Sequence, residues 1–211
     1  MSNRLVDLLG RQRVGRLDQL PQLAAGRGCI ELLVALDRRG LRRQRLVLDS
    51  PPLPLRDLAA ALVWPEEGRT AIVPGVSFVD PDEADVMRGE EVQLLGAFAA
   101  GMVPANALVC HPGTHNKWAR LEDGRITRFR TVMTGEIFNL LREHSILADL
   151  LAEDAEADDA FAAGVSRGLH DECLTAELFK IRARVLLGQA DADVAPSYGS
   201  GLLIGTDVRV G

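Results

Sequence analysis

Hydrophobic residues follow a regular pattern from residue 53 onward, and the pattern alternates between helical and strand-like spacing. Residues 53–63 place apolar side chains at helical intervals, which predicts a short amphipathic helix. The apolar run at 69–76 predicts a buried strand ended by its Pro-Gly pair, and the polar residues 77–85 predict a loop. Residues 90–101 are apolar enough to form a largely buried helix capped by its final glycine.

The remaining pattern predicts a strand, a hairpin and a series of helices. Residues 107–113 form the strand, and residues 114–133 form a β-hairpin whose turn is Asp123-Gly124. The predicted helices are 136–145, 158–170, 174–188 and a fourth that starts near residue 197. This order favours an α/β fold in which a mixed lobe packs on a helical layer.

Residues 1–50 differ from the rest of the chain, because they hold ten arginines against five acidic residues and lack a sustained apolar period. Two interpretations remain open. The segment is a basic arm that binds nucleic acid or a partner, or it is a stretch that is not the native reading of its gene, joined to the genuine one near Pro54.

Composition bounds the class of protein. A length of 211 residues with 47% hydrophobic content suffices for one sizeable domain or two small lobes. A net charge of -6 argues against a general nucleic-acid binder, which needs a basic surface. The three cysteines lack metal-ligand spacing, and no apolar run reaches the length of a membrane span. We therefore expect a cytoplasmic protein that binds small molecules, without nucleic-acid or membrane partners.

The acidic pair Glu90-Glu91 is the first candidate for chemistry. At the start of a helix, a carboxylate lies near the positive end of the helix dipole, stays ionised and is able to accept a hydroxyl proton. Acidic residues also favour first helical turns simply because they complement the dipole, so this position alone leaves both interpretations open.

A second candidate is the PGTHNKW segment after the strand at 107–113. Gly113 and Thr114 either expose backbone amides to a phosphate group or form an ordinary tight turn. His115 and Lys117 add possible cationic donors beside the turn. If this segment is extended, their alternate spacing places both on one face.

Several segments together resemble the 2-dehydro-3-deoxygalactonokinase family over about residues 69–209. In order, they are MRGEEVQLLGAF, PGTHNKW, FRTVMTGEIFNLLREHSIL, AFAAGVSRGL, LFKIRARVLLG and SGLLIG. The resemblance implies a partial actin-like ATPase (ribonuclease H-like) fold with an added helical layer. It also implies ATP and Mg²⁺ as cofactors and a sugar acid as substrate, whereas the metal ligands are not identified.

The resemblance also implies roles for the acidic pair. In carbohydrate kinases of this superfamily, a Gly-Asp pair that opens a helix supplies the base, and Gly89-Glu90 falls at this place. Glu90 would accept the proton of the substrate hydroxyl, and Glu91 would hold the substrate or the metal. We infer further that Arg88 grips the substrate carboxylate through a bidentate pair, with pairing to Glu90 or Asp85 as the alternative.

The phosphate side follows from the same comparison. Gly113 and Thr114 would cradle the γ-phosphate, while His115 and Lys117 would stabilise its developing charge. Thr134, Gly135 and Glu136 are predicted to form a capped helix start with a structural role. His144 is expected to be an ordinary core or surface histidine.

The chain departs from the superfamily pattern in two ways. Residues 1–50 lack the Asp-x-Gly-Thr/Ser loop that binds Mg²⁺ and phosphate in these kinases. The sequence also stops at Gly211, before the region that carries the adenosine pocket in the family. We therefore expect three parts. They are an atypical Arg-rich segment at 1–50, the remainder of a first lobe with the base-bearing helix at 51–105, and a truncated second lobe at 106–211 with the phosphate turn, hairpin and helices.

The leading hypothesis is ATP-dependent phosphorylation of the terminal hydroxyl of 2-dehydro-3-deoxy-D-galactonate to its 6-phosphate, in galactonate catabolism. A noncatalytic remnant that keeps sugar-acid binding or oligomer contacts is the alternative, and a basic-arm interaction module is a third possibility. The sequence does not distinguish galactonate-derived from gluconate-derived acids as the substrate, because discrimination at one hydroxyl depends on pocket contacts. It also leaves open whether the chain forms a homo-oligomer and whether a truncated chain is stable.

Overall fold

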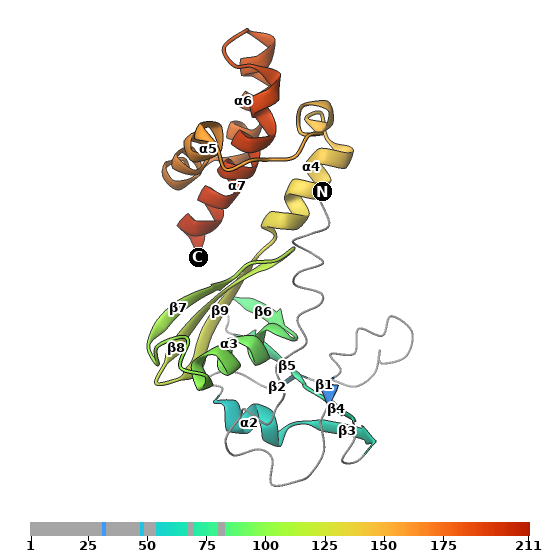
Figure 1. The fold of residues 1–211 in the computed structure, drawn as a ribbon, viewed down its shortest axis with the longest axis vertical. Coiled ribbons are helices and arrows are strands. Elements are labelled where there is room, and N and C mark those ends of the chain that lie inside the picture. Colours follow the sequence, from blue (N-terminus) through green and yellow to red (C-terminus); the bar gives the residue numbers. More distant parts are fainter. Residues whose placement is uncertain (1–30, 33–46, 49–53, 67–69, 80–82) are drawn as a thin grey trace. The chain divides into compact units, whose positions relative to one another are not determined.

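The computed structural model describes residues 31–32, 47–48, 54–66, 70–79 and 83–211. These residues form two compact units (Figure 1). The sheet unit contains the described residues up to His111 together with Lys117–Thr131, and the helical unit contains Pro112–Asn116 and Val132–Gly211.

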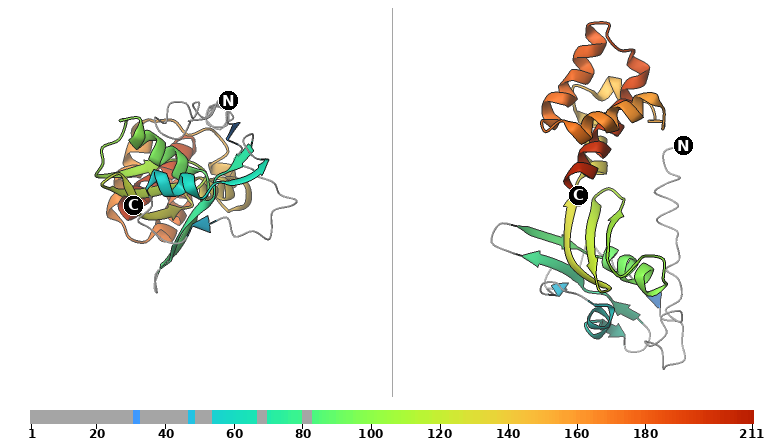
Figure 2. Two further views of the ribbon diagram at one scale, coloured as in Figure 1. Left: turned by 90° about the horizontal axis from the view of Figure 1, so that it is seen from below. Right: turned by 90° about the vertical axis from the view of Figure 1, so that its left-hand side faces the viewer.

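The sheet unit contains three small sheets, with strand orders β1-β4-β3, β2-β5-β6 and β7-β8-β9. Its elements are β1 (Glu31–Leu32), β2 (Val47–Leu48), α2 (Leu55–Ala60), β3 (Val63–Glu66), β4 (Thr70–Ile72), β5 (Gly75–Val79), β6 (Ala84–Met87), α3 (Glu90–Ala99), β7 (Ala107–His111), β8 (Asn116–Glu122) and β9 (Arg125–Val132). Figure 2 shows the curved sheet of β7, β8 and β9 with α3 beside it. Helices and strands thus mix in the described residues, which confirms the α/β class.

The core of the sheet unit lies between α3 and the β8–β9 hairpin. Leu94 and Leu95 of α3 belong to the same buried cluster as Ala119, Leu121 and Ile126 of the hairpin. In β8 the buried residues alternate with more exposed ones, as expected for a strand with one face on a core. Each fully buried leucine contributes about 2 kcal/mol by leaving water, so this packing attaches the hairpin to α3.

The prediction of a loop at 77–85 is wrong for most of these residues. Its two ends belong to the antiparallel strands β5 and β6, where Phe78 pairs with Asp85. The polar composition suggested a loop, but the Asp85 carboxylate accepts hydrogen bonds from the backbone N–H and the hydroxyl of Thr131. Because its polar group is satisfied in this way, Asp85 fits within a strand. The strand predicted at 69–76 ends earlier, since β4 stops at Ile72, and Gly75 is already the first residue of β5.

Other predicted elements of this unit are confirmed. Asp123 and Gly124 form the hairpin turn with φ values of 49° and 70°, and Gly101 follows α3 with φ of 70°. The amphipathic helix at 53–63 is shorter than predicted, since α2 covers only Leu55–Ala60.

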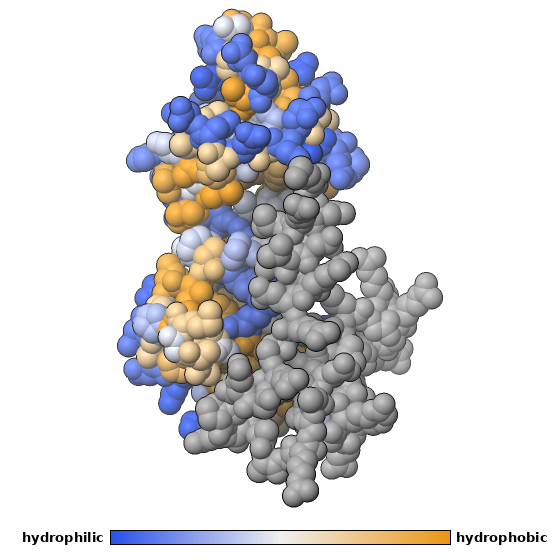
Figure 3. All heavy atoms as spheres, in the orientation of Figure 1, coloured by the Kyte–Doolittle hydropathy of each residue, from blue (hydrophilic) through white to orange (hydrophobic). Residues whose placement is uncertain are grey.

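The helical unit contains α4 (Thr134–His144), η2 (Ala148–Leu150), α5 (Asp159–His170), α6 (Leu174–Leu186), η3 (Ala192–Val194) and α7 (Ala195–Val210). All four helices predicted from sequence are therefore present. His144 is exposed, in agreement with an ordinary surface role. Figure 3 shows hydrophilic and hydrophobic residues interspersed on the visible face of this unit.

Close packing of α5 on α7 holds the helical unit together. A Cβ added at Gly201 of α7 would lie 2.2 Å from the carbonyl oxygen of Phe161, and one at Gly205 would lie 2.2 Å from that of Val165. The two backbones approach so closely that only glycine fits at these positions. Beside this crossing, the Arg167 guanidinium donates two hydrogen bonds of 2.7 Å to the buried carboxylate of Glu177 and holds its pKa at about 2.

The compact units do not coincide with the ranges expected from sequence. The hairpin was grouped with residues 106–211, but its strands pack with α3 in the sheet unit because their alternate side chains share that core. The division into kinase lobes at 51–105 and 106–211 stays a prediction. The basic-arm and reading-frame interpretations of residues 1–50 concern residues outside the described ones, apart from β1 and β2. Within the described part of the chain, none of the helices combines the length and apolar character that crossing a membrane requires.

Candidate functional site

The first part of the candidate site is the acidic helix start, residues 88–91, between β6 and α3. Gly89 has φ of 116°, a backbone region that favours glycine, and this conformation turns the chain from the strand into the helix. Half-buried Glu90 is the first residue of α3, and its Oε2 accepts a hydrogen bond of 3.0 Å from the backbone N–H of Arg88. The helix start thus holds a carboxylate at the position predicted for a base.

Glu91 lies beside Glu90 but is fully buried. Its Oε2 accepts a hydrogen bond of 2.7 Å from the backbone N–H of Gly89, whereas its Oε1 is buried without a hydrogen-bond partner. Burial raises the pKa of the Glu91 carboxyl to about 7, against the opposing effect of the backbone N–H groups of Glu91 and Gly89. Sequence suggested that Glu91 holds substrate or metal, but the structure places it inside the sheet unit, so that role stays a prediction.

The role of Arg88, either binding a substrate carboxylate or pairing with Glu90 or Asp85, stays a prediction. The Arg88 side chain is exposed, and its backbone N–H donates the hydrogen bond to Glu90 described above. Asp85 is engaged with Thr131. An exposed side chain is compatible with both alternatives.

Lys117 occupies a position that sequence did not anticipate. It is 5% exposed, and its Nζ donates to the carbonyl oxygen of Val86 at 2.8 Å and to the hydroxyl of Thr131 at 2.6 Å. These bonds tie the start of β8 to β6, close in sequence to the acidic helix start. His115 precedes β8, which begins at Asn116, so the predicted extended segment with His115 and Lys117 on one face is wrong.

The second part of the candidate site is the glycine turn, residues 112–116, in the helical unit. Gly113, Thr114 and His115 are exposed. The backbone N–H of Gly113 donates a hydrogen bond of 2.7 Å to Oδ1 of Asn116, and the N–H of Glu136 donates one of 3.1 Å to the carbonyl oxygen of Thr114. The turn is therefore shaped by the side chain of Asn116, which sequence reasoning did not single out although it lies within the same motif.

The start of α4 has no side-chain cap, so the capped helix start predicted at Thr134, Gly135 and Glu136 is wrong, and these residues support the glycine turn instead. Thr134 donates from its hydroxyl to Oδ2 of Asp207 at 2.6 Å. The imidazole of His115 pairs with the carboxylate of Glu136. Gly135 is needed here, because an added Cβ would lie 2.9 Å from the carbonyl oxygen of Gly113. These residues stabilise the turn through contacts distant in sequence.

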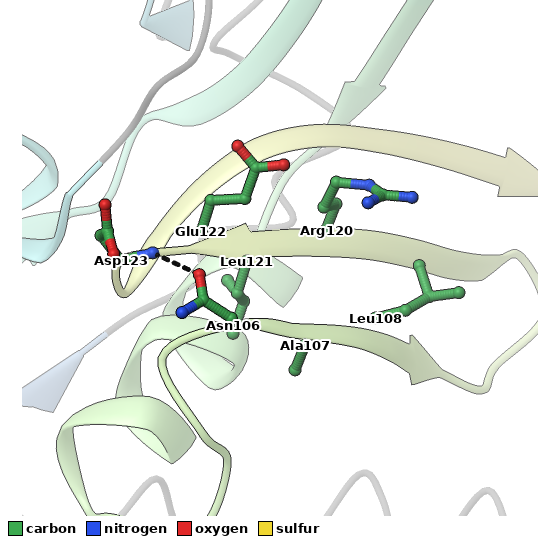
Figure 4. Close-up of a pocket in the computed structure, with 7 residues that line it drawn as sticks. All are labelled: Asn106, Ala107, Leu108, Arg120, Leu121, Glu122 and Asp123. Atoms are coloured by element: carbon green, nitrogen blue, oxygen red, sulfur yellow. Dashed lines mark hydrogen bonds between the residues drawn. The ribbon is translucent and has the colours of Figure 1, made fainter.

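A shallow pocket of about 570 Å³ lies elsewhere on the sheet unit, at the hairpin turn (Figure 4). Its lining includes Asn106, Arg120 and Glu122. None of the residues predicted for the site contributes to this pocket. The described residues also contain no group of three or more His, Cys, Asp and Glu side chains placed to hold a metal ion.

Fold and site together define an α/β protein with an acidic helix start and a glycine turn. The chain belongs to the 2-keto-3-deoxy-galactonokinase family, which matches residues 43–211. It is 42% identical over 137 residues to the 2-dehydro-3-deoxygalactonokinase of Escherichia coli (strain K12). It is also 46% identical over 142 residues to DgoK1 of Rhizobium meliloti (strain 1021), whose name assigns it the same activity with the qualifier "probable".

Each of these two matches covers 65% of this chain and 46% of the relative, so the chain spans about half the length of the curated relatives it matches. A crystal structure from Sinorhizobium meliloti, named as that of a proposed 2-dehydro-3-deoxygalactonokinase, is similar with a TM-score of 0.72 and 38% identity. This similarity covers 79% of the present chain and 57% of the crystallised one. The family expected from sequence is therefore confirmed.

Proposed function

We propose that this chain acts in the ATP-dependent phosphorylation of 2-dehydro-3-deoxy-D-galactonate at its terminal hydroxyl, a step of galactonate catabolism in the cytoplasm. The observation that carries the proposal is the 42% identity over 137 residues to a relative named for this kinase. Family membership and the structural neighbour also support a partial actin-like ATPase fold, because the superfamily of these kinases has that fold.

Glu90 is the proposed base. Its place in the first turn of α3 supports this role, because the helix dipole favours an ionised carboxylate that accepts the hydroxyl proton. Exposed Arg88, two residues earlier, would bind the carboxylate of the sugar acid. Gly89 sets the direction of the chain between them through its positive φ.

The glycine turn is the proposed phosphate-binding element. Exposed Gly113 and Thr114 would contact the γ-phosphate, and His115 would offset the charge that develops during transfer. Gln93 of α3 is hydrogen-bonded to His111, the residue before the turn in sequence. This bond links α3 to the end of β7 within the sheet unit. Lys117 would act from its buried position by supporting the start of β8.

The proposed Mg²⁺ can be compared with the carboxylates of the acidic helix start. Magnesium usually keeps several waters and uses one or two carboxylates besides the substrate phosphates. Glu91 does not fit such a site, since it is fully buried and its raised pKa favours the neutral acid, and Glu90 is assigned to the base, so the magnesium ligands are not identified among the described residues. When bound, Mg²⁺ neutralises charge on the transferred phosphoryl group.

A coupled assay of ADP release with 2-dehydro-3-deoxygalactonate and ATP tests this proposal. We expect Glu90→Gln to lower kcat by at least about a hundredfold, because the amide cannot accept the proton. Glu122→Gln is the matched control, since Glu122 is an exposed carboxylate on β8 beside the hairpin turn. Full turnover in Glu90→Gln would remove Glu90 from the mechanism. Calorimetric binding of the sugar acid without any turnover would favour the noncatalytic alternative.

A further inference from the structure

Asp207 joins the last part of α7 to the glycine turn. It is 3% exposed, and its Oδ2 accepts hydrogen bonds from Nδ2 of Asn116 and from the hydroxyl of Thr134. Asn116 lies 91 residues and Thr134 lies 73 residues earlier in the chain. A single buried carboxylate oxygen therefore connects three segments of the helical unit.

Asn116 extends this connection to the backbone of the turn. Its Oδ1 accepts from the N–H of Gly113, while its Nδ2 donates to Asp207. The orientation of the amide group is determined by both partners, because a backbone N–H only donates and an ionised carboxylate only accepts. Asp207 thus sets the position of the Asn116 side chain, and Asn116 sets the conformation at Gly113.

The start of α4 provides a second connection from Asp207 to the turn. Thr134 donates to Asp207, and the N–H of Glu136, two residues later, donates to the carbonyl oxygen of Thr114. Gly135, between them, allows the backbone of α4 to approach the turn closely. Both connections start at Asp207, and they reach the turn at Gly113 and at Thr114.

From this geometry we infer that Asp207 is a positioning residue for phosphate binding by the glycine turn. The inference rests on the proposed function, in which Gly113 and Thr114 contact the transferred phosphoryl group. Phosphoryl transfer depends mainly on positioning and electrostatic stabilisation, so a small displacement of the turn lowers the rate strongly. Asp207 acts through Asn116 and Thr134 and need not contact the substrate.

A swap of the two side chains tests this role with little change in volume. In Asn116→Asp, two carboxylates face each other, although the new side chain still accepts from Gly113. We expect hydrogen exchange at residues 112–116 to accelerate and kcat to fall by about tenfold or more, with KM for the sugar acid unchanged. Adding Asp207→Asn supplies a donor at position 207 again, and we expect this double variant to recover slow exchange and most of the turnover.

Arg209→Ala is the matched control, because Arg209 is in the same last turn of α7 and bonds to the carbonyl oxygen of Gly168 at 3.1 Å, away from the glycine turn. It should lower the melting temperature without altering exchange at 112–116. The inference fails if the double variant behaves like Asn116→Asp, or if Arg209→Ala accelerates exchange at the turn equally. Absence of turnover in the unmodified chain would count against the proposed function, whereas the exchange measurements would still decide the role of Asp207.

Discussion

The carboxyl group of Glu91 accepts a hydrogen bond of 2.7 Å from the backbone N–H of Gly89, two residues earlier in the chain. This bond closes the turn at the start of α3, next to Glu90. The carboxyl group is fully buried, and its other oxygen has no hydrogen-bond partner. A buried acid in such surroundings supports the turn best when it is neutral, because ionisation would leave a charge without sufficient solvation.

Stability should therefore depend on pH through Glu91. Its pKa is about 7 in the folded protein and about 4.5 when the carboxyl is unburied, so between these pH values the folded state retains a proton that the unfolded state has lost. The contribution of the bound proton to the free energy of unfolding is fully present below about pH 4.5. It is lost as pH rises to about 7, and the loss is at most about 3 kcal/mol. Glu91→Gln should remove the part of the pH dependence of stability that arises from Glu91.

Urea unfolding of the unmodified chain and of Glu91→Gln at pH 5, 6, 7 and 8 measures the effect. The relevant quantity is the difference in unfolding free energy between the two proteins, because other acidic residues contribute equally to both. We expect Glu91→Gln to gain stability relative to the unmodified chain as pH rises. A difference that does not change between pH 5 and 8 would contradict the assigned pKa.

Replacement of Gly89 by alanine should disturb the acidic helix start. At φ of 116°, alanine suffers backbone strain that costs about 1–3 kcal/mol or moves the turn. We expect lower thermal stability and a loss of turnover that exceeds the loss of folded protein. Gly96→Ala is the control in the same helix, since nothing lies within 4 Å of its added Cβ and alanine favours helix by about 1 kcal/mol. Equal behaviour of the two variants would contradict a special role for Gly89.

Replacement of Gly201 by alanine should destabilise the packing of α5 on α7. An added methyl group there would meet the backbone carbonyl of Phe161 at 2.2 Å, so the helices must separate. We expect Gly201→Ala to lower the unfolding free energy by at least about 2 kcal/mol. Gly199→Ala, two residues earlier in α7, should cost less because its methyl group would meet the flexible end of Leu151 at 3.1 Å. Chemical denaturation compares the two, and the reverse order of stability would refute this packing argument.

Local signals identified much of the fold. The Asp123-Gly124 turn was predictable because positive φ at two successive positions is met best by such residues. The acidic start and glycine end of α3 were predictable because they satisfy the dipole and the exposed carbonyl groups of a helix. The β5–β6 hairpin was missed because Asp85, polar in sequence, is satisfied by Thr131, a residue 46 positions away.

The candidate site was predictable only in part. Glu90 and Gly113 lie where the motifs indicated, at the first turn of a helix and in a turn after a strand. Asp207 gave no local signal, because an acid near the end of a helix ordinarily lies on a solvated face. Its importance depends on Asn116 and Thr134, which come close to it only in the folded chain.

The sequence by itself determined the family, the positions of most helices and strands after residue 54, and the two motifs that carry the proposed chemistry. Periodicity, turn residues and helix-end residues are local, so their physical effects can be read along the chain. Tertiary structure decided that Glu91 and Lys117 are buried and that Asp207 holds the glycine turn. Burial and hydrogen-bond partners depend on residues far apart in sequence, because desolvation and directional bonding act only between groups that folding brings together.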